Sequence, residues 1–256
     1  MVSLATENLG VRLGGREVLG GLSTQLPAGL LVGVLGPNGA GKSSFLKALA
    51  GLLPHAGRVL LDGAPLAHMP RAEVARRIAY LPQGQTLHWP LAVERLVGLG
   101  RLPHLAPLSR IADSDRAAIE RAMRRTDVAH LAQRTATELS GGERARVLLA
   151  RALAVEAPVL LADEPLTSLD PAHQIEGMEI LRDEARAGAL VVAVMHDLAL
   201  AYRYCDRILL LDRGRLVAEG PAGDVLTPGN LAEVYAISAF YGPPAERLLV
   251  PLDRLR

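Results

Sequence analysis

Short apolar runs alternate with stretches of helical periodicity along much of the chain. Four runs rich in Val, Leu and Ile are bounded by Gly, Pro, Asp or His and predict strands buried on both faces, at 30–35, 159–162, 190–195 and 208–211. Apolar residues recur at helical spacing in 44–53, 173–187 and 197–204. This β-α alternation predicts an α/β fold with a parallel sheet covered by helices.

Two segments depart from that alternation. Residues 4–26, with a turn at Gly14-Gly15, and the run 58–61 predict an antiparallel β layer. From 91 to 155, Arg and Ala are frequent and helical patterns dominate, which predicts an inserted helical subdomain. We therefore expect a single domain over 1–256, with the α/β core and β layer in 1–90 and 156–226, the helical subdomain in 91–155 and a short polar C-terminal tail in 227–256.

Composition narrows the functional classes. No uninterrupted apolar run approaches the roughly 18 to 20 residues of a membrane helix. The first ten residues lack the pattern of a signal peptide, so we expect the chain to stay in the cytosol. Basic and acidic residues number 28 and 27, a formal charge of +1, which argues against a nucleic-acid partner. Cys205 is the only cysteine, which excludes an internal disulfide.

A phosphate-binding loop follows the run 30–35. The pattern G-x-x-x-x-G-K-[ST] is matched by Gly36, Pro37, Asn38, Gly39, Ala40, Gly41, Lys42 and Ser43. Glycines allow backbone N–H groups to surround a phosphate, and the start of the following helix adds partial positive charge. We expect Lys42 to reach the β- and γ-phosphates and Ser43 to bind Mg²⁺. Ser44 can add a second hydroxyl contact, to the α- or β-phosphate. An ordinary glycine turn is the alternative.

The run 159–162 ends in two adjacent carboxylates, Asp163 and Glu164. Successive side chains on a strand point in opposite directions, so the two groups can serve different purposes. We expect Asp163 to hold Mg²⁺ through water and Glu164 to polarise the water that attacks the γ-phosphate. A surface acidic turn stopped by Pro165 is the alternative.

A second helix start carries small and polar residues. Leu139, Ser140, Gly141, Gly142 and Glu143 precede a stretch of helical periodicity. Such a start binds anions, although taken alone it also fits an ordinary capped helix. Because the chain already holds one complete phosphate loop, binding the nucleotide of a neighbouring subunit would explain this second one.

The order of these motifs resembles that of the ATPase subunits of ABC transporters, from about residue 4 to about residue 225. Gln83 after Tyr-Leu-Pro, the triplet Ser168, Leu169 and Asp170, and His196 after the run 190–195 belong to the same resemblance. It implies ATP as substrate and Mg²⁺ as cofactor, with Ser43, Gln83 and Asp163 contacting the metal. It also implies that His196 contacts the γ-phosphate and positions Glu164.

The resemblance further implies a head-to-tail dimer of two copies. The segment 139–143, which we name the signature segment, would contact ATP held by the partner's phosphate loop, and 168–170 would join the two active sites. Closure would drive separate integral-membrane permease subunits, with a periplasmic or extracellular substrate-binding protein acting indirectly. The chain would then lie peripherally on the cytoplasmic face of the inner membrane.

Three positions depart from the family pattern. Glu143 stands where glutamine is more usual, and Leu166 follows Pro165 where threonine is usual. The aromatic residue expected near Leu13 is missing, since no Phe, Tyr or Trp precedes Phe45. The first two positions touch the expected dimer face, and the third leaves open which group holds the adenine.

The stretch 98–104, Gly-Leu-Gly-Arg-Leu-Pro-His, resembles the Gly-Arg-x-Pro-His motif of ATPases that serve iron-chelate, haem and cobalamin importers. A helix-ending turn stopped by Pro103 is the alternative. We expect 83–105 to receive a helix of the membrane subunit, with Trp89 exposed on that surface. A buried Trp89 is the alternative. Import of another solute and export remain alternatives. A soluble ABC ATPase acting on ribosomes or DNA is a further alternative, although such proteins typically carry two cassettes or a long coiled-coil insertion, and this chain has neither.

Overall fold

The central sheet of the molecule is mostly parallel. The computed structural model describes residues 2–84, 87–106, 109–167 and 169–255. Within these ranges the sheet has six strands in the order β10-β9-β3-β8-β7-β6, namely β3 (Leu31–Leu35), β6 (Ile78–Leu81), β7 (Val159–Asp163), β8 (Leu190–Val194), β9 (Arg207–Asp212) and β10 (Arg215–Pro221). Among these described strands, only β10 pairs antiparallel, as the hairpin partner of β9.

Burial on both faces explains the apolar runs. Every residue of β3, β7 and β8 is buried, and alternate side chains enter different clusters. Leu31, Leu160 and Val191 pack on the face with α6 (Pro171–Arg186) and α7 (Leu198–Tyr204). Val32 and Leu161 pack on the opposite face, with α1 (Lys42–Leu49). The predicted α/β fold is confirmed.

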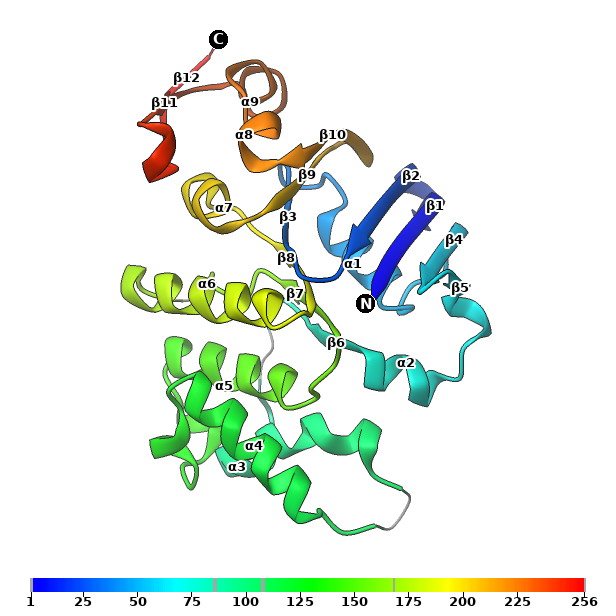
Figure 1. Cartoon of the computed structure of the whole chain (residues 1–256), viewed down its shortest axis with the longest axis vertical. Helices are drawn as coiled ribbons and strands as arrows, with labels where there is room; N and C mark the ends of the chain where they lie inside the picture. The colour runs from blue at the N-terminus through cyan, green and yellow to red at the C-terminus, as the bar shows by residue number, and fades with distance from the viewer. Residues whose placement is uncertain (1, 85–86, 107–108, 168, 256) are drawn as a thin grey trace.

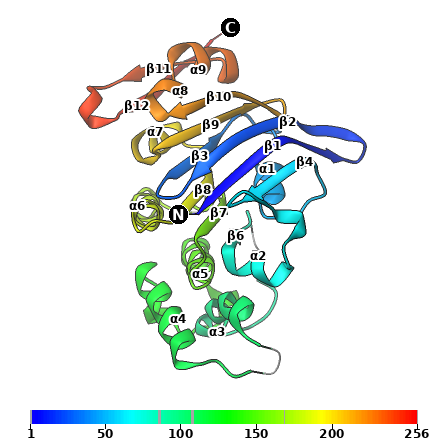
Figure 2. The same ribbon diagram turned by 45° about the vertical axis from the view of Figure 1, so that its right-hand side comes forward.

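An antiparallel layer of four strands lies beside this sheet (Figure 2). In the described part of the chain its order is β2-β1-β4-β5, comprising β1 (Ser3–Leu13), β2 (Arg16–Pro27), β4 (Ala56–Leu61) and β5 (Ala64–Pro65). Phe45, Leu46 and Leu49 of α1 share one buried cluster with Leu4 of the layer and Val32 of the central sheet. The helix start is thereby fixed between two sheets. It begins two residues earlier than the periodicity suggested, at Lys42.

A helical region lies at the end of the molecule away from the chain's C-terminus (Figure 1). Its elements are α3 (Val93–Gly98), η2 (Leu99–His104), α4 (Asp113–Arg125), η3 (Ala129–Leu131), η4 (Ala136–Glu138) and α5 (Gly141–Leu153). They surround a cluster of their own, with Val93, Ile119 and Val147. On α5, Leu148 and Leu149 instead enter the cluster of the central sheet, so this helix belongs to both bodies. Before it come η1 (Leu66–His68) and α2 (Arg71–Arg77).

The segment expected as a short polar tail is folded. After α8 (Ala222–Val225) come α9 (Pro228–Tyr235), β11 (Ile237–Tyr241), η5 (Pro244–Glu246) and β12 (Leu249–Arg254), with β11 and β12 paired antiparallel. Thr227 caps α9 by accepting a hydrogen bond from the Asn230 amide at 3.2 Å. Leu231, Val234 and Leu249 are buried in the main cluster. Apolar residues are frequent in this segment, as in 234–241 and 248–250, and they supply the side chains that pack, so the segment differs from the polar tail expected.

Within the described ranges, every helix is too short or too polar to span a bilayer.

Candidate active site

The loop between β3 and α1 depends on two glycines. Gly36 has φ +148°, and a Cβ there would lie 2.1 Å from the Leu211 carbonyl oxygen. Gly41 has φ +96°, and its Cβ would lie 2.8 Å from the Val18 carbonyl oxygen. Any side chain would therefore push the loop away from both neighbouring segments. The loop is held against β9 and β2, with its amides at the start of α1.

Lys42 folds back over this loop. Its Nζ donates hydrogen bonds to the carbonyl oxygens of Gly36, at 2.7 Å, and Pro37, at 3.0 Å. Burial lowers the pKa of Lys42, while the charges of Glu164 and Asp163 oppose that change. Among the described residues, the direct partners of the ammonium are these neutral carbonyls, which leaves its charge available to an anion.

A buried carboxylate lies beside the loop. Asp163, at the end of β7, is only 2% exposed. The Ser43 hydroxyl donates to its Oδ1 at 3.0 Å, and the Tyr80 hydroxyl reaches its Oδ2 at 3.4 Å. Burial raises the pKa of Asp163, and the neighbouring charge of Glu164 adds to the rise. Burial, together with Asp163, also raises the pKa of Tyr80. The carboxylate would therefore gain from a cation placed next to it.

Glu164 adopts the left-handed backbone conformation, with φ +53°. Its amide donates to the Val194 carbonyl at 3.2 Å, which ties the end of β7 to β8. Its Oε1 lies 2.6 Å from Nε2 of His196, and its Oε2 accepts from the Thr167 hydroxyl at 3.1 Å. These contacts hold the carboxylate in one orientation, because both of its oxygens have partners.

One cavity of about 670 Å³ joins these groups. The parallel strands end at one edge of the sheet, so the loop, the acidic strand and the histidine converge there. The predicted residues that line the cavity are Asn38, Gly39, Ala40, Gly41, Lys42, Ser43, Ser44, Gln83, Glu164 and His196. Gly36, Pro37 and Asp163 contact this lining without bordering the cavity themselves.

The signature segment begins α5. Ser140 and Glu143 form a capping box: the Ser140 Oγ accepts from the Glu143 amide at 3.3 Å, and the Glu143 Oε2 accepts from the Ser140 amide at 2.8 Å. Ser140 and Gly141 are exposed. Gly141 borders a separate cavity of about 220 Å³, which shares Gln83, Glu164 and Thr167 with the larger one. Within a single chain, the signature segment therefore does not border the phosphate-loop cavity.

The triplet 168–170 can be followed only in part. Ser168 lies outside the described residues. Leu169 packs against the main core, and Asp170 caps α6 by accepting from the His173 amide at 3.0 Å. These two residues thus stand at the start of α6, just after the cavity wall formed by Thr167.

Three residues of the site were not predicted. Val18 and Thr167 line the main cavity, and Tyr80 contacts Asp163. Tyr80 pairs with Leu161 in the parallel strands β6 and β7, a register that only the structure reveals. Val18 carries no chemical signal. Leu13 is 43% exposed and is not among the residues that line this cavity.

Comparisons with known proteins agree with this geometry. The ABC transporter family profile matches residues 19–167. The chain is 48% identical to the hemin import ATP-binding protein HmuV of Pseudomonas entomophila, covering 95% of this chain and 96% of the relative. It is 45% identical to the cobalamin import ATP-binding protein BtuD of Halobacterium salinarum, covering 91% and 59%.

Among solved structures, the fold is similar to a chain from an ABC transporter described as metal-chelate type, in an inward-facing conformation. The TM-score is 0.85 at 27% identity, and the match covers 99% of both chains. Taken with the phosphate loop, the acidic strand end and the family match, this similarity leads to one conclusion. The chain belongs to the ATP-binding subunits of ABC transporters.

Proposed function

We propose that this ATP-hydrolysing subunit drives the import of a metal chelate of the iron-siderophore, haem or cobalamin type. The observation that carries the proposal is the similarity, over more than nine-tenths of the chain, to proteins named for hemin and cobalamin import. The Gly-Arg-x-Pro-His motif supports the same class. Transport of another solute, or export, is the alternative.

In this proposal the phosphates of the nucleotide and the attacking water contact different groups. The loop amides and Lys42 bind the β- and γ-phosphates, and Glu164 accepts a hydrogen bond from the attacking water. Water adds to the γ-phosphorus, the bond to the bridging oxygen breaks, and ADP, phosphate and the proton lost by the water leave. His196, whose Nε2 lies 2.6 Å from Oε1 of Glu164, holds that carboxylate and would contact the γ-phosphate.

The residues near Lys42 fit a Mg²⁺ ion. Mg²⁺ prefers oxygen ligands and is commonly bound by one carboxylate together with substrate phosphates. Ser43 and Asp163 present two oxygens 3.0 Å apart, and Asp163 is a buried carboxylate whose raised pKa calls for a nearby cation. Ser43, Asp163 and Gln83 would hold the metal. Its chemistry there is to neutralise phosphate charge and orient the phosphates.

The exposed signature segment supports a head-to-tail dimer. In it, Ser140, Gly141, Gly142 and Glu143 of one copy meet ATP on the other copy, and 168–170 join the sites. A permease helix would dock on 83–105, of which 85–86 lie outside the described residues; Trp89 is 74% and Leu102 59% exposed. The dimer would lie on the cytoplasmic face of the inner membrane, with a substrate-binding protein acting on the far side.

Two measurements test the proposal. The purified chain should release phosphate from ATP in the presence of Mg²⁺, whereas Glu164→Gln should not; Glu233→Gln, which removes an exposed carboxylate on α9, is the matched control. A strain lacking this gene should lose growth on hemin, on a ferric siderophore or on cobalamin, each supplied separately. Normal growth on all three would contradict the cargo class without affecting the ATPase assignment.

A further inference from the structure

The stretch Gly98–His104 has two different sides. It covers the end of α3 and all of η2, and it connects to α4 (Figure 1). Leu99 and Leu102 are 40% and 59% exposed and point outward. Gly100 and Arg101 are buried. The inward side faces α5, the helix that starts with the signature segment.

Gly100 permits direct backbone contact between η2 and the last turn of α5. A Cβ at this position would lie 2.3 Å from the Arg151 carbonyl oxygen and 3.1 Å from the Ala154 Cβ. Neither neighbour is the end of a flexible side chain, so a methyl group here would separate the two helices. This contact explains the second glycine of the stretch.

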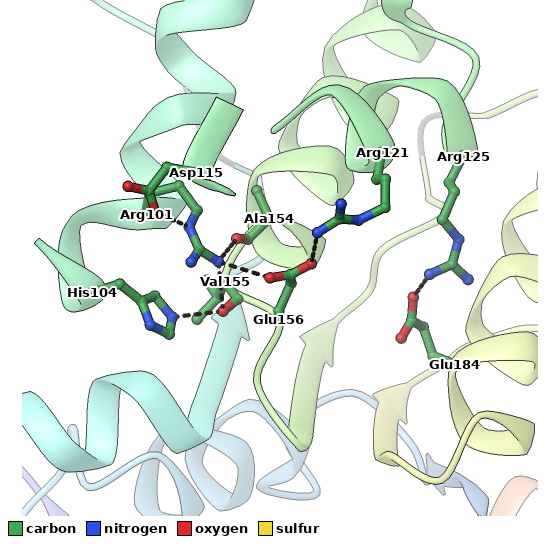
Figure 3. Close-up of polar contacts among 9 residues, drawn as sticks. All are labelled: Arg101, His104, Asp115, Arg121, Arg125, Ala154, Val155, Glu156 and Glu184. Carbon is green, nitrogen blue, oxygen red and sulfur yellow. Dashed lines mark hydrogen bonds and ion pairs between the residues drawn. The ribbon is translucent and has the colours of Figure 1, made fainter. Parts of the chain in front are cut away.

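Arg101 holds the C-terminal end of α5 (Figure 3). Its side chain is 8% exposed. Nη1 donates to the carbonyl oxygen of Ala154, the C-cap of α5, at 2.8 Å and lies 3.2 Å from the Glu156 Oε2. Nε donates to Asp115 Oδ1 at 2.9 Å. A guanidinium can contact all three because its donors are fixed in a plane, and its charge suits a helix C-terminus.

His104 adds a contact to Val155, the residue after Ala154. Its Nε2 lies 2.8 Å from the Val155 carbonyl oxygen, which accepts a hydrogen bond from the ring (Figure 3). Ala154 is buried in the helical cluster, whereas Val155 is buried in the cluster of the central sheet. Residues 154–156 are therefore the junction at which α5 leaves the helical region and leads into β7.

We propose that Gly100, Arg101 and His104 form a clamp that sets the orientation of α5, and that Arg101 is a positioning residue for the signature segment. The inference rests on the proposed contact of that segment with ATP on a second copy. A 13-residue helix is about 20 Å long, so a tilt of about 10° at the clamped end moves the other end by about 3 Å. Displacements of about 1 Å can cost on the order of a hundredfold in rate.

A purely structural role makes a different prediction. A clamp that only stabilises the fold would lower the melting temperature without changing the function of molecules that remain folded. A positioning clamp affects the step that needs the signature segment, which is ATP-dependent dimerisation. It leaves ATP binding to the chain's own phosphate loop unchanged, because the clamp contacts none of the residues lining that cavity.

The experiment uses the full chain carrying Glu164→Gln, in which bound ATP is not hydrolysed. Arg101→Lys and His104→Ala are added separately, and Arg116→Lys, at an arginine on α4 whose side chain is 70% exposed, is the control. Equilibrium titration measures ATP binding, light scattering measures the dimer, and thermal melts identify the folded temperature range. Arg101→Lys and His104→Ala should bind ATP within about twofold of the parent but need at least about tenfold more protein to dimerise. Arg116→Lys should match the parent.

A rescue variant separates the hydrogen bond from the bulk of the ring. His104→Gln keeps an N–H donor for the Val155 carbonyl and should recover most of the dimerisation lost in His104→Ala. Folded clamp variants that dimerise like the parent would overturn the clamp. If Arg101→Lys does not fold, the His104 pair decides the question alone. A parent that binds ATP but never dimerises contradicts the proposed dimer itself, and the clamp's positioning role falls with it.

Discussion

Nε2 of His196 lies 2.6 Å from Oε1 of Glu164, and the two residues come from loops that follow adjacent strands, β8 and β7. The Thr167 hydroxyl contacts the other carboxylate oxygen at 3.1 Å. The Glu164 side chain is 9% exposed, whereas that of His196 is 43% exposed. The carboxylate is thus held from two sides at the edge of the phosphate-loop cavity, which it also lines.

Replacing Glu164 by glutamine should abolish turnover and preserve ATP binding. The amide keeps the shape of the side chain but is a poor acceptor for a water proton, so we expect a loss of a hundredfold or more, on the order expected for a single active-site group. The dimer with ATP should then accumulate, as size-exclusion runs with and without ATP would reveal. Near-normal turnover would contradict the role given to Glu164.

Glu143 and Arg134 form an ion pair at the start of α5, with 2.9 Å between the Glu143 Oε1 and Arg134 Nη1. Hydrogen bonds from Ser140, followed by the charge of Arg134, lower the pKa of Glu143, so this residue carries a negative charge within the signature segment proposed to meet phosphate. Glu143→Gln keeps an acceptor for the Ser140 amide, and we expect stability to change by less than about 1 kcal/mol.

The two ion-pair partners should have opposite effects on the dimer. Glu143→Gln removes a repulsive charge and should promote ATP-dependent dimerisation, whereas Arg134→Ala exposes that charge and should weaken it. Dimerisation of both variants at low and high salt is the measurement, since salt should shrink the difference. Equal behaviour at low salt would mean that Glu143 acts only as a helix cap.

The fold was largely predictable because the buried strands are short, apolar and bounded by turn residues, as in 159–162 and 190–195. The phosphate loop was predictable because its glycines stand at a fixed spacing in the sequence. The structure shows why they are needed, since Gly36 closely approaches the Leu211 carbonyl oxygen. Val18 could not be identified, because an aliphatic side chain has no pattern that distinguishes lining a cavity from packing. The inward orientation of Arg101 could not be predicted either, since an arginine in a polar stretch usually faces solvent.

Trp89 and Leu102 should mark the permease-docking surface. Their side chains are 74% and 59% exposed, and a large exposed aromatic residue is a typical interface anchor. With a co-expressed permease, single cysteines at these two positions should form crosslinks, while a cysteine at Phe240, also exposed at 52% in β11, should not. Crosslinks from Phe240 alone would place docking on the C-terminal hairpin instead.

Acid should weaken the fold partly through Asp115. The hydrogen bond from Arg101 and then that from the Ala112 amide lower the pKa of Asp115 below its ordinary value of 3.8. The folded state therefore releases this proton more readily than the unfolded chain. The stabilisation is fully present above about pH 4 and is lost as the pH falls through the lower folded value. Urea unfolding from pH 7 to pH 3 should give a shallower acid decline for Asp115→Asn, which is less stable at pH 7. Parallel declines would exclude Asp115 as a contributor.

Leu13 stands at the position where related ATPases are expected to stack an aromatic ring on adenine. Leu13 pairs with Arg16 in the hairpin of β1 and β2, and Val18 of the same strand β2 lines the cavity. An aromatic stack on a base contributes roughly 1 to 3 kcal/mol, or about 5- to 150-fold in affinity, while leucine offers only dispersion and burial. A guanidinium from Arg12 or Arg16 could supply part of that contact.

We therefore expect phosphate contacts to dominate binding, ATP and GTP to be distinguished weakly, and Leu13→Tyr to tighten ATP binding. Equilibrium titration of both nucleotides against the wild type and Leu13→Tyr tests this, with Leu252→Tyr as a control because it places the same ring on the exposed strand β12. Tyrosine should improve affinity only if the ring reaches the base from the hairpin end, so a gain at residue 13 and none at residue 252 locates the adenine beside β1. A strong preference of the wild type for ATP, without a gain in Leu13→Tyr, would mean that another group holds the base, and Val18 on the cavity wall would be the first residue to replace.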